Sequence, residues 1–329
     1  MNKVYITAIS KFLPNKPVSN LAIKKLAHKH FQLNQMELLA GGTSTPDLLI
    51  PSHVSMVQGE LKANATEIIS ASGSCNAGMQ ALKFAFLSVK SGNTQNAISF
   101  GSEKVSSWIH ARNYKKESEH WKNMEKKPIL AFEKDFLRWM LSDGAGATLL
   151  QNKANPKGIS LEINWMEIKS FSNELPTCMY AGGKKLSNEE MIPWRDFQTD
   201  ELSKNSYLSL RQDVELLGDH IVNKGSDFMK DIIVKYKLDL DDISYFLPHL
   251  SSEYFREEIY KDFIKKGINI PPEKWFTNLT KVGNVGSASA YLMLEELFNE
   301  MPLKKGEKIL LLVPESARFS YTFCLFTVV

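Results

Sequence analysis

Two stretches of the sequence, around Cys75 and around Asn284, follow the same order of residue types. Each begins with a turn of small residues and continues as an amphipathic helix, over residues 76–92 in the first and 287–301 in the second. A polar turn that contains glycine then leads to an apolar strand, residues 96–103 and 307–316, ending in Ser-Glu or Glu-Ser. This repeated order predicts a fold of two similar halves.

The rest of the chain alternates between short apolar strands and helices. Residues 3–10, 65–72 and 243–249 have the pattern of strands, and residues 21–31 and 251–267 have the pattern of helices. The alternation predicts an α/β protein. Residues 115–127 and 170–206 are polar and irregular, and we expect them to form insertions or lids over the scaffold.

Composition excludes several classes of protein. A chain of 329 residues with 43% hydrophobic and 23% charged residues can bury the core of one large or two medium domains. The net charge is +3 and glutamates interrupt the lysine-rich runs, so we expect no nucleic-acid partner. The first residues lack a signal peptide, and no run approaches the ~18 apolar residues of a membrane span, so we expect a cytoplasmic location without membrane association.

Three cysteines, Cys75, Cys178 and Cys324, are too few and too scattered for a disulfide framework or a zinc site. We therefore expect reduced thiols and no metal. Cys75 stands where small residues give way to the helix over residues 76–92. A helix N-terminus is expected to lower the pKa of this thiol, and its N–H groups are expected to bind an oxyanion. A buried cysteine at a helix start with no chemistry is the alternative, and this stretch alone leaves both open.

Two later residues favour the reactive interpretation. His249 follows an apolar strand and a proline, and Asn284 lies between glycines before a helix. A neutral histidine can accept a proton, and an amide can donate hydrogen bonds to an oxygen that gains charge. Each residue alone is typical of a structural role. Cysteine, histidine and asparagine, each at a junction between a strand and a helix, are a much rarer combination.

Five motifs in this order resemble the ketoacyl-ACP synthase III family of the thiolase superfamily. They are FLPNKPVSN at 12–20, SGSCNAGMQAL at 72–82, LSDGAGATLL at 141–150, LPHLSSEYF at 247–255 and KVGNVGSASAYLMLEEL at 281–297. The resemblance implies a thiolase-like five-layered αβαβα fold of two pseudo-symmetric halves, expected here at residues 1–169 and 170–329. It also implies a catalytic triad of Cys75, His249 and Asn284.

The resemblance further implies the reaction and its partners. The expected reaction is a Claisen-type condensation of an acyl group on Cys75 with a malonyl or β-ketoacyl thioester. Acyl-carrier protein or acyl-CoA would supply the thioesters, and no cofactor is expected. Relatives form homodimers through the strand after the nucleophile helix, here residues 96–103, which is expected to be an edge strand. A silent partner subunit of a heterodimeric ketosynthase, or an acyltransferase or thioesterase that uses Cys75, are the alternatives.

Four further segments are similar to the branch of this family that builds dialkylresorcinol and related aryl pigments. They are residues 43–53, 104–108, 132–147 and 314–321. In that branch a second, ring-closing condensation follows the first. Polyketide or fatty-acid biosynthesis is therefore the expected context.

The sequence departs from the family pattern at several positions. The family commonly has Cys-Ala-Gly, whereas here Asn76 separates Cys75 from the Ala-Gly pair. Aligning the Ala-Gly pairs would place Asn76 at the position of the nucleophile. Aligning the cysteines instead places Leu82 and Ala85 where the family's helix has leucine and alanine, which favours Cys75. Asn20 runs directly into residues 21–30, where the family carries a longer segment that binds coenzyme A. SARFS, at 316–320, replaces the family's glycine-rich turn.

Some binding residues can be carried over from the family to this sequence. The backbone N–H groups of Cys75 and Ser320 are the expected oxyanion donors. Ser252 stands where the family has an asparagine that contacts coenzyme A. Arg211 and Arg256 lie near the family's docking positions and are expected to bind an acidic carrier protein or coenzyme A, with solvated surface charge as the alternative.

Overall fold

The computed structural model describes residues 1–14, 31–110 and 135–329. The predicted helix at 21–31, except Phe31, the irregular segment at 115–127 and most of the motif at 12–20 lie outside the described residues. A nine-stranded sheet dominates the fold, in the order β11-β12-β13-β6-β1-β5-β4-β2-β3. Its strands are β1 (Tyr5–Phe12), β2 (Leu38–Thr43), β3 (Glu67–Ser72), β4 (Asn96–Glu103), β5 (Gly144–Gln151), β6 (Leu161–Ser170), β11 (Ile243–Pro248), β12 (Lys308–Glu315) and β13 (Ser320–Val328).

The large sheet consists of two sets of strands with the same arrangement. In the first set β3, β2 and β4 are parallel, and β5 and β1 continue it with antiparallel pairs. In the second set Trp275 forms a parallel bridge to β11, β11 pairs in parallel with β12, and β13 and β6 follow with antiparallel pairs. Strand β6 thus takes the place in the second set that β1 takes in the first. The division at residues 169 and 170 stays a prediction.

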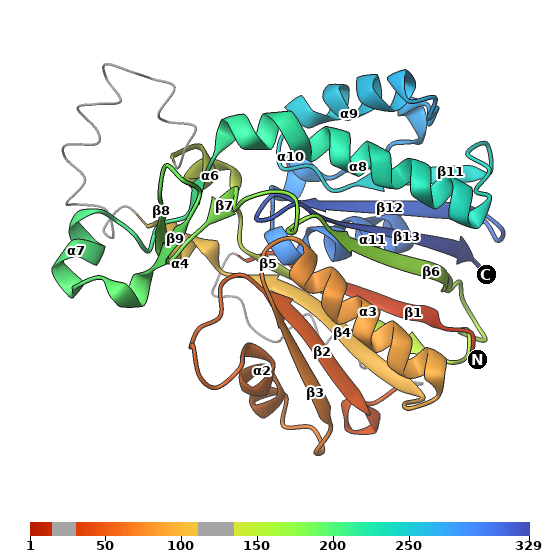
Figure 1. Cartoon of the computed structure of the whole chain (residues 1–329). Helices are drawn as coiled ribbons and strands as arrows, with labels where there is room; N and C mark the ends of the chain where they lie inside the picture. The colour runs from red at the N-terminus through yellow and green to blue at the C-terminus, as the bar shows by residue number, and fades with distance from the viewer. Residues whose placement is uncertain (15–30, 111–134) are drawn as a thin grey trace.

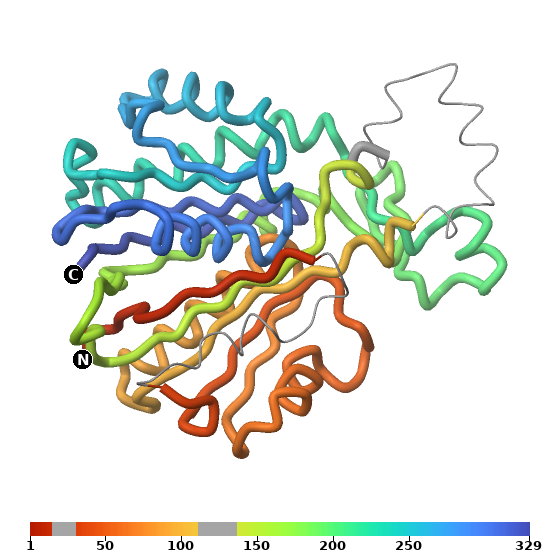
Figure 2. Tube along the Cα trace, turned by 180° about the vertical axis from the view of Figure 1, so that it is seen from behind, coloured from red at the N-terminus to blue at the C-terminus, as the bar shows by residue number. Residues whose placement is uncertain are grey.

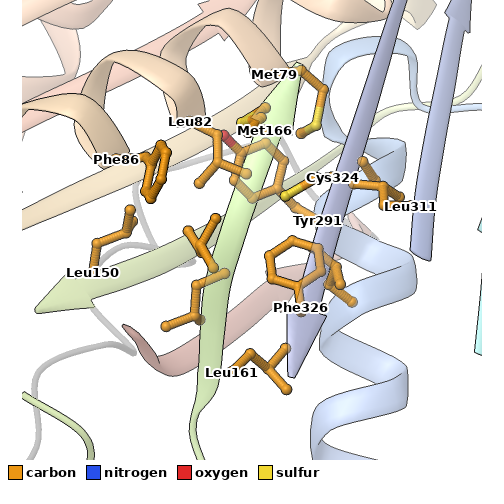
Figure 3. Packing of buried hydrophobic residues seen from close by; sticks show 14 of the residues in the cluster. Met79, Leu82, Phe86, Leu150, Leu161, Met166, Tyr291, Leu311, Cys324 and Phe326 are labelled. Atoms are coloured by element: carbon orange, nitrogen blue, oxygen red, sulfur yellow. The ribbon is translucent and has the colours of Figure 1, made fainter. Parts of the chain in front are cut away.

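The strands bury side chains on both faces, which produces separate core layers. In β12, Ile309 and Leu311 face the core that surrounds the central helices, whereas Leu310 and Leu312 face the opposite core. Because side chains alternate along a strand, such a sheet must be covered on both sides. Figure 3 shows the central core, where Tyr291 lies near Cys324 and Phe326 of β13.

Helices complete five layers, as Figure 1 shows. Helix α2 (His53–Leu61) covers the outer face of the first set, and α3 (Asn76–Ser91) and α11 (Ser289–Glu300) pack between the two sets. Helices α8 (Val214–Tyr236) and α9 (Tyr254–Lys265) cover the outer face of the second set. The α/β class and the five-layered arrangement predicted from the sequence are therefore confirmed.

The expectation that residues 96–103 form an edge strand is wrong. Strand β4 lies between β5 and β2, and all eight of its residues are buried. An apolar strand covered on both faces has the same sequence pattern in the middle of a sheet as at its edge. The strand at this end of the sheet is β3, which directly precedes the Cys75 turn and is largely exposed.

The remaining elements are short. Residues 170–206, predicted as an irregular insertion, contribute small pieces that extend to one side of the layered scaffold (Figures 1 and 2). No helix within the described ranges is long and apolar enough to cross a membrane. The short elements are β7 (Met179–Tyr180), β8 (Gly183–Lys185), β9 (Met191–Pro193), β10 (Arg211–Gln212), α4 (Val105–Ile109), α6 (Asp135–Met140), α7 (Thr199–Lys204), α10 (Leu279–Val282), η1 (Leu33–Gln35), η4 (Trp194–Asp196), η5 (Pro272–Lys274) and η6 (Gly286–Ala288).

Candidate active site

Cys75, His249 and Asn284 line one cavity of about 270 Å³. Cys75 is the N-cap of α3, His249 directly follows β11, and Asn284 lies between α10 and η6. The structure therefore gathers the three residues that the sequence singled out, from segments far apart in the chain. Their catalytic roles stay predictions.

Close packing of glycines positions the two helix starts at this cavity. A Cβ atom on Gly78 of α3 would lie 2.1 Å from the carbonyl oxygen of Ser287, and one on Gly101 of β4 would lie 2.2 Å from the same oxygen. A Cβ atom on Gly42 of β2 would meet the backbone of Ala77 at 2.2 Å. Only glycine permits this approach of α3, β2, β4 and η6, which places the Cys75 turn beside the turn that follows Asn284.

The protonation state of Cys75 differs from the expectation. We expected the helix start to lower the pKa of this thiol, but burial, with the charge of Glu315 and then of Glu103, raises it to about 12. The neighbouring Ser74 hydroxyl, 3.7 Å from the sulfur, opposes this rise. Cys75 is therefore a thiol at neutral pH and needs a base to become a nucleophile.

Glu315 explains why the helix start does not favour the thiolate. Its Oε2 accepts hydrogen bonds from the backbone N–H of Ser74 at 3.3 Å and of Asn76 at 3.0 Å, and its Oε1 accepts one from the Ser320 hydroxyl at 3.2 Å. The backbone donors on either side of Cys75 thus already bind a carboxylate. Three donors indicate an ionised group, although burial raises the pKa of this carboxyl.

A second glutamate does the same for the other half. Glu103, at the end of β4, accepts a hydrogen bond from the Ser287 N–H at 3.1 Å and from the Ser44 N–H at 3.0 Å. Glu315 lies at the end of β12, the matching strand. Each glutamate therefore caps the start of the central helical segment in the opposite half.

His249 is neutral in this environment. Burial lowers its pKa to about 4, and its backbone N–H donates to the Leu312 carbonyl at 2.7 Å. A neutral imidazole on the cavity wall can accept a proton from a thiol that attacks a substrate. It can also donate a hydrogen bond to a carbonyl oxygen.

Asn284 is held from two sides. Its backbone exchanges hydrogen bonds with the chain at the end of α6. The Ser142 N–H donates to the Asn284 carbonyl at 2.8 Å, and the Asn284 N–H donates to the Met140 carbonyl at 3.3 Å. Its Oδ1 accepts from the Gly286 N–H at 3.0 Å. With the carbonyl side of the amide fixed in this way, its NH₂ group is the side available to donate to a ligand in the cavity.

Asn76 and Ser320 have structural contacts rather than places on the cavity wall. The Asn76 amide donates to the Ser320 hydroxyl at 2.8 Å and accepts from the Thr322 hydroxyl at 2.7 Å, which ties α3 to β13. Asn76 is fully buried, whereas Cys75 lines the cavity; the choice of Cys75 as the nucleophile stays a prediction. Ser316 and Ala317, from the turn before Ser320, line the cavity instead of Ser320.

The three predicted binding residues lie next to the cavity without lining it. Each directly neighbours lining residues in the chain, which include Gln212, Ser251 and Phe255. The Arg211 guanidinium donates to the Asn205 carbonyl at 2.6 Å, the Ser252 hydroxyl accepts from the Tyr254 N–H at 3.3 Å, and Arg256 pairs with Glu253 at 2.8 Å. Within the described part of the chain, no three histidine, cysteine or acidic side chains gather as a metal site would require.

Comparisons with known proteins agree with this fold. Residues 233–316 match the family model described as 3-oxoacyl-[acyl-carrier-protein] synthase III C terminal. Beta-ketoacyl-[acyl-carrier-protein] synthase III of Clostridium novyi is 25% identical over 298 residues, which cover 89% of this chain and 79% of the relative. The Aquifex aeolicus enzyme of the same name is 25% identical over 292 residues, 88% of this chain and 76% of the relative.

Solved structures show the same fold. The Aquifex aeolicus synthase III structure has a TM-score of 0.69 at 19% identity and covers 98% of this chain and 99% of its own. A variant of Xanthomonas campestris OleA has a TM-score of 0.73 at 16% identity, with 99% and 98% covered. AbyA1, a tetronic acid condensing enzyme, has a TM-score of 0.70 at 14% identity, with 98% and 99% covered.

This chain therefore has the fold of the synthase III, OleA and AbyA1 structures. Over most of its length the chain is similar to beta-ketoacyl-[acyl-carrier-protein] synthase III enzymes, and residues 233–316 match the model of that family's C-terminal part.

Proposed function

We propose that this protein is a condensing acyltransferase that forms a carbon–carbon bond by Claisen-type condensation. The observation that carries this function is the meeting of Cys75, His249 and Asn284 on one cavity. Relatives named beta-ketoacyl-[acyl-carrier-protein] synthase III support it. Acyl-carrier protein or acyl-CoA thioesters are the substrates that this family name implies.

The first half-reaction loads Cys75. Because the thiol is protonated and His249 is neutral, His249 takes the proton as the sulfur attacks the thioester carbonyl. The carbon–sulfur bond of the donor then breaks, and the donor thiol leaves with that proton. The Cys75 N–H and the turn at 316–319, two of whose residues line the cavity, are the proposed oxyanion donors.

The second half-reaction forms the carbon–carbon bond. His249 and Asn284 donate hydrogen bonds to the thioester carbonyl of the second substrate while it becomes an enolate. A malonyl unit would lose carbon dioxide to give this carbanion, and a β-ketoacyl thioester would lose a proton. The carbanion attacks the acyl carbonyl, the bond to Cys75 breaks, and the thiol is restored. In a dialkylresorcinol-type enzyme, a ring-closing condensation follows.

Intact-protein mass spectrometry after incubation with acyl thioesters tests this division of labour. Cys75→Ala should show no mass increase, whereas His249→Ala and Asn284→Ala should still be acylated, His249→Ala more slowly, and should fail to condense. Acylation that persists in Cys75→Ala would refute the nucleophile. Products with malonyl or β-ketoacyl partners distinguish condensation from transfer alone, and lack of any acylation of the natural protein would indicate a silent subunit.

A homodimer is proposed as the assembly. The exposed edge strand β3 supports it, because its outer edge pairs with no other described strand and can pair with a second copy across a twofold axis. Sedimentation at micromolar concentration should give twice 37.3 kDa. A monomer would contradict the proposal.

The partner and the location are further parts of the proposal. Arg211 and Arg256 lie beside cavity-lining residues, which supports a docking role toward an acidic carrier protein. Replacing both with glutamine should raise KM for acyl-carrier protein more than KM for a short synthetic thioester. Equal effects on both substrates would contradict docking. The cytoplasmic location expected from the sequence stays a prediction.

A further inference from the structure

The cavity that contains Cys75 also extends along the groove between α8 and α9. From α8 it is lined by Leu217, Ile221 and Gly225, and from α9 by Phe255, Ile259 and Phe263. Both sets repeat every four residues, so each lies along one face of its helix. We call this part of the cavity, between α8 and α9, the arm. Eight residues of helix correspond to about 12 Å, which is the length of the arm.

The far end of the arm is closed. Phe263 is 1% exposed and Tyr321, which also lines the cavity, is fully buried. A Cβ atom on Gly225 would lie 3.0 Å from the ring of Tyr321. A larger side chain at position 225 would therefore occupy the inner end of the arm or displace Tyr321.

The polar groups at this end already have partners within the protein. The Tyr321 hydroxyl donates to the Ile221 carbonyl at 2.9 Å, and the Ser226 hydroxyl donates to the Val222 carbonyl at 3.0 Å. A ligand with amides, such as the pantetheine part of a coenzyme, would lose hydrogen bonds to water here and gain few in return. An alkyl chain would lose none.

We propose that the groove between α8 and α9 holds the alkyl chain of a medium-length or longer acyl substrate, and that Gly225 and Tyr321 set the limit of chain length. This inference rests on the proposed function, because the chain is that of the acyl group loaded on Cys75. Each methylene buried in the groove should improve kcat/KM for loading by about fourfold, up to the closed end.

The test compares two glycines on the same helix. Gly225→Leu blocks the inner end, whereas Gly218→Leu is the matched control, because a Cβ atom on the exposed Gly218 meets nothing within 4 Å. Acylation of Cys75 is timed by intact mass with acyl-CoA thioesters of two to sixteen carbons. We expect the rate to rise with chain length in the natural protein and in Gly218→Leu. In Gly225→Leu the ratio of the long-chain rate to the acetyl rate should fall at least tenfold.

An unchanged ratio in a folded Gly225→Leu protein would overturn the inference, and so would a natural protein whose loading does not depend on chain length. Ile221→Phe, which narrows the arm midway, provides the second variant if Gly225→Leu does not fold. Thermal stabilisation by free fatty acids of graded length is a readout that needs no chemistry. If no thioester loads Cys75, the proposed function fails. Thermal stabilisation that grows with the length of the fatty acid and is lost in the blocked variants would still support binding of an alkyl chain in the groove.

Discussion

Replacing Glu315 with glutamine should make Cys75 more reactive toward alkylating reagents. The carboxylate faces the thiol from the end of β12, Glu103 faces it from β4, and neutral His249 lines the same cavity. Glutamine has nearly the same shape, keeps an oxygen for the Asn76 N–H and removes the negative charge. The thiolate of Cys75 then loses a repulsive neighbour while its burial is unchanged.

The size of the effect follows from the pKa of the thiol. With a pKa of about 12, only about one Cys75 in ten thousand is ionised at pH 8. Burial is the largest cause of the rise and Glu315 is the second. A charge next to a titrating group typically shifts its pKa by at least about one unit, so removing the Glu315 charge should lower the pKa of Cys75 and raise its thiolate fraction about tenfold at pH 8.

The assay is the pH dependence of Cys75 alkylation by iodoacetamide, followed by intact mass from pH 7 to 11. We expect the rate at pH 8 to rise about tenfold in Glu315→Gln and by less in Glu103→Gln, since Glu103 contributes less to the pKa. Cys75→Ala provides the background rate of the other thiols. If the pH dependence of alkylation is unchanged in a folded Glu315→Gln protein, the Glu315 carboxylate only caps the helix and does not control the pKa of Cys75.

Further predictions concern stability and are measured by urea unfolding. Burial holds the pKa of His249 at about 4, below its usual 6.5. The unfolded chain therefore binds the proton first, and the stability that neutral His249 provides is present above pH 6.5 and is lost as the pH falls toward 4. His249→Asn should remove about 3 kcal/mol of this decrease in the free energy of unfolding. Gly78→Ala should cost about 1–3 kcal/mol and slow acylation, because its methyl group would overlap the Ser287 carbonyl, and a loss below 0.5 kcal/mol would contradict the close packing. Gly218→Ala, on the exposed face of α8, should instead gain about 0.5–1 kcal/mol from helix propensity, and a clear loss of stability would refute this.

Local patterns predicted the elements around the site closely. The helix expected over residues 76–92 is α3, which ends at Gly92 with a left-handed φ of 85°. The strand expected at 96–103 coincides with β4, and the strand at 243–249 differs from β11 by one residue. Helix caps and apolar runs depend on neighbours along the chain, so the sequence carries this information directly.

The missed features depend on contacts between distant segments. The sequence pattern of β4 cannot show which strands flank it, and the charge near Cys75 depends on Glu315, far along the chain. A signal for the two glutamates was present, because each apolar strand of the repeat ends in a glutamate. Their role could not be inferred until the structure showed that each one crosses to the opposite half.

The crossed glutamates also decide when the site can form during synthesis. Glu103 binds a backbone group 184 residues ahead of it, and Glu315 binds one 239 residues behind it. The first half leaves the ribosome with the Cys75 turn still uncapped, and the turn is completed only when β12, among the last strands made, reaches it. Contacts this distant form late in folding, so the Cys75 turn takes its final form only after the second half has docked.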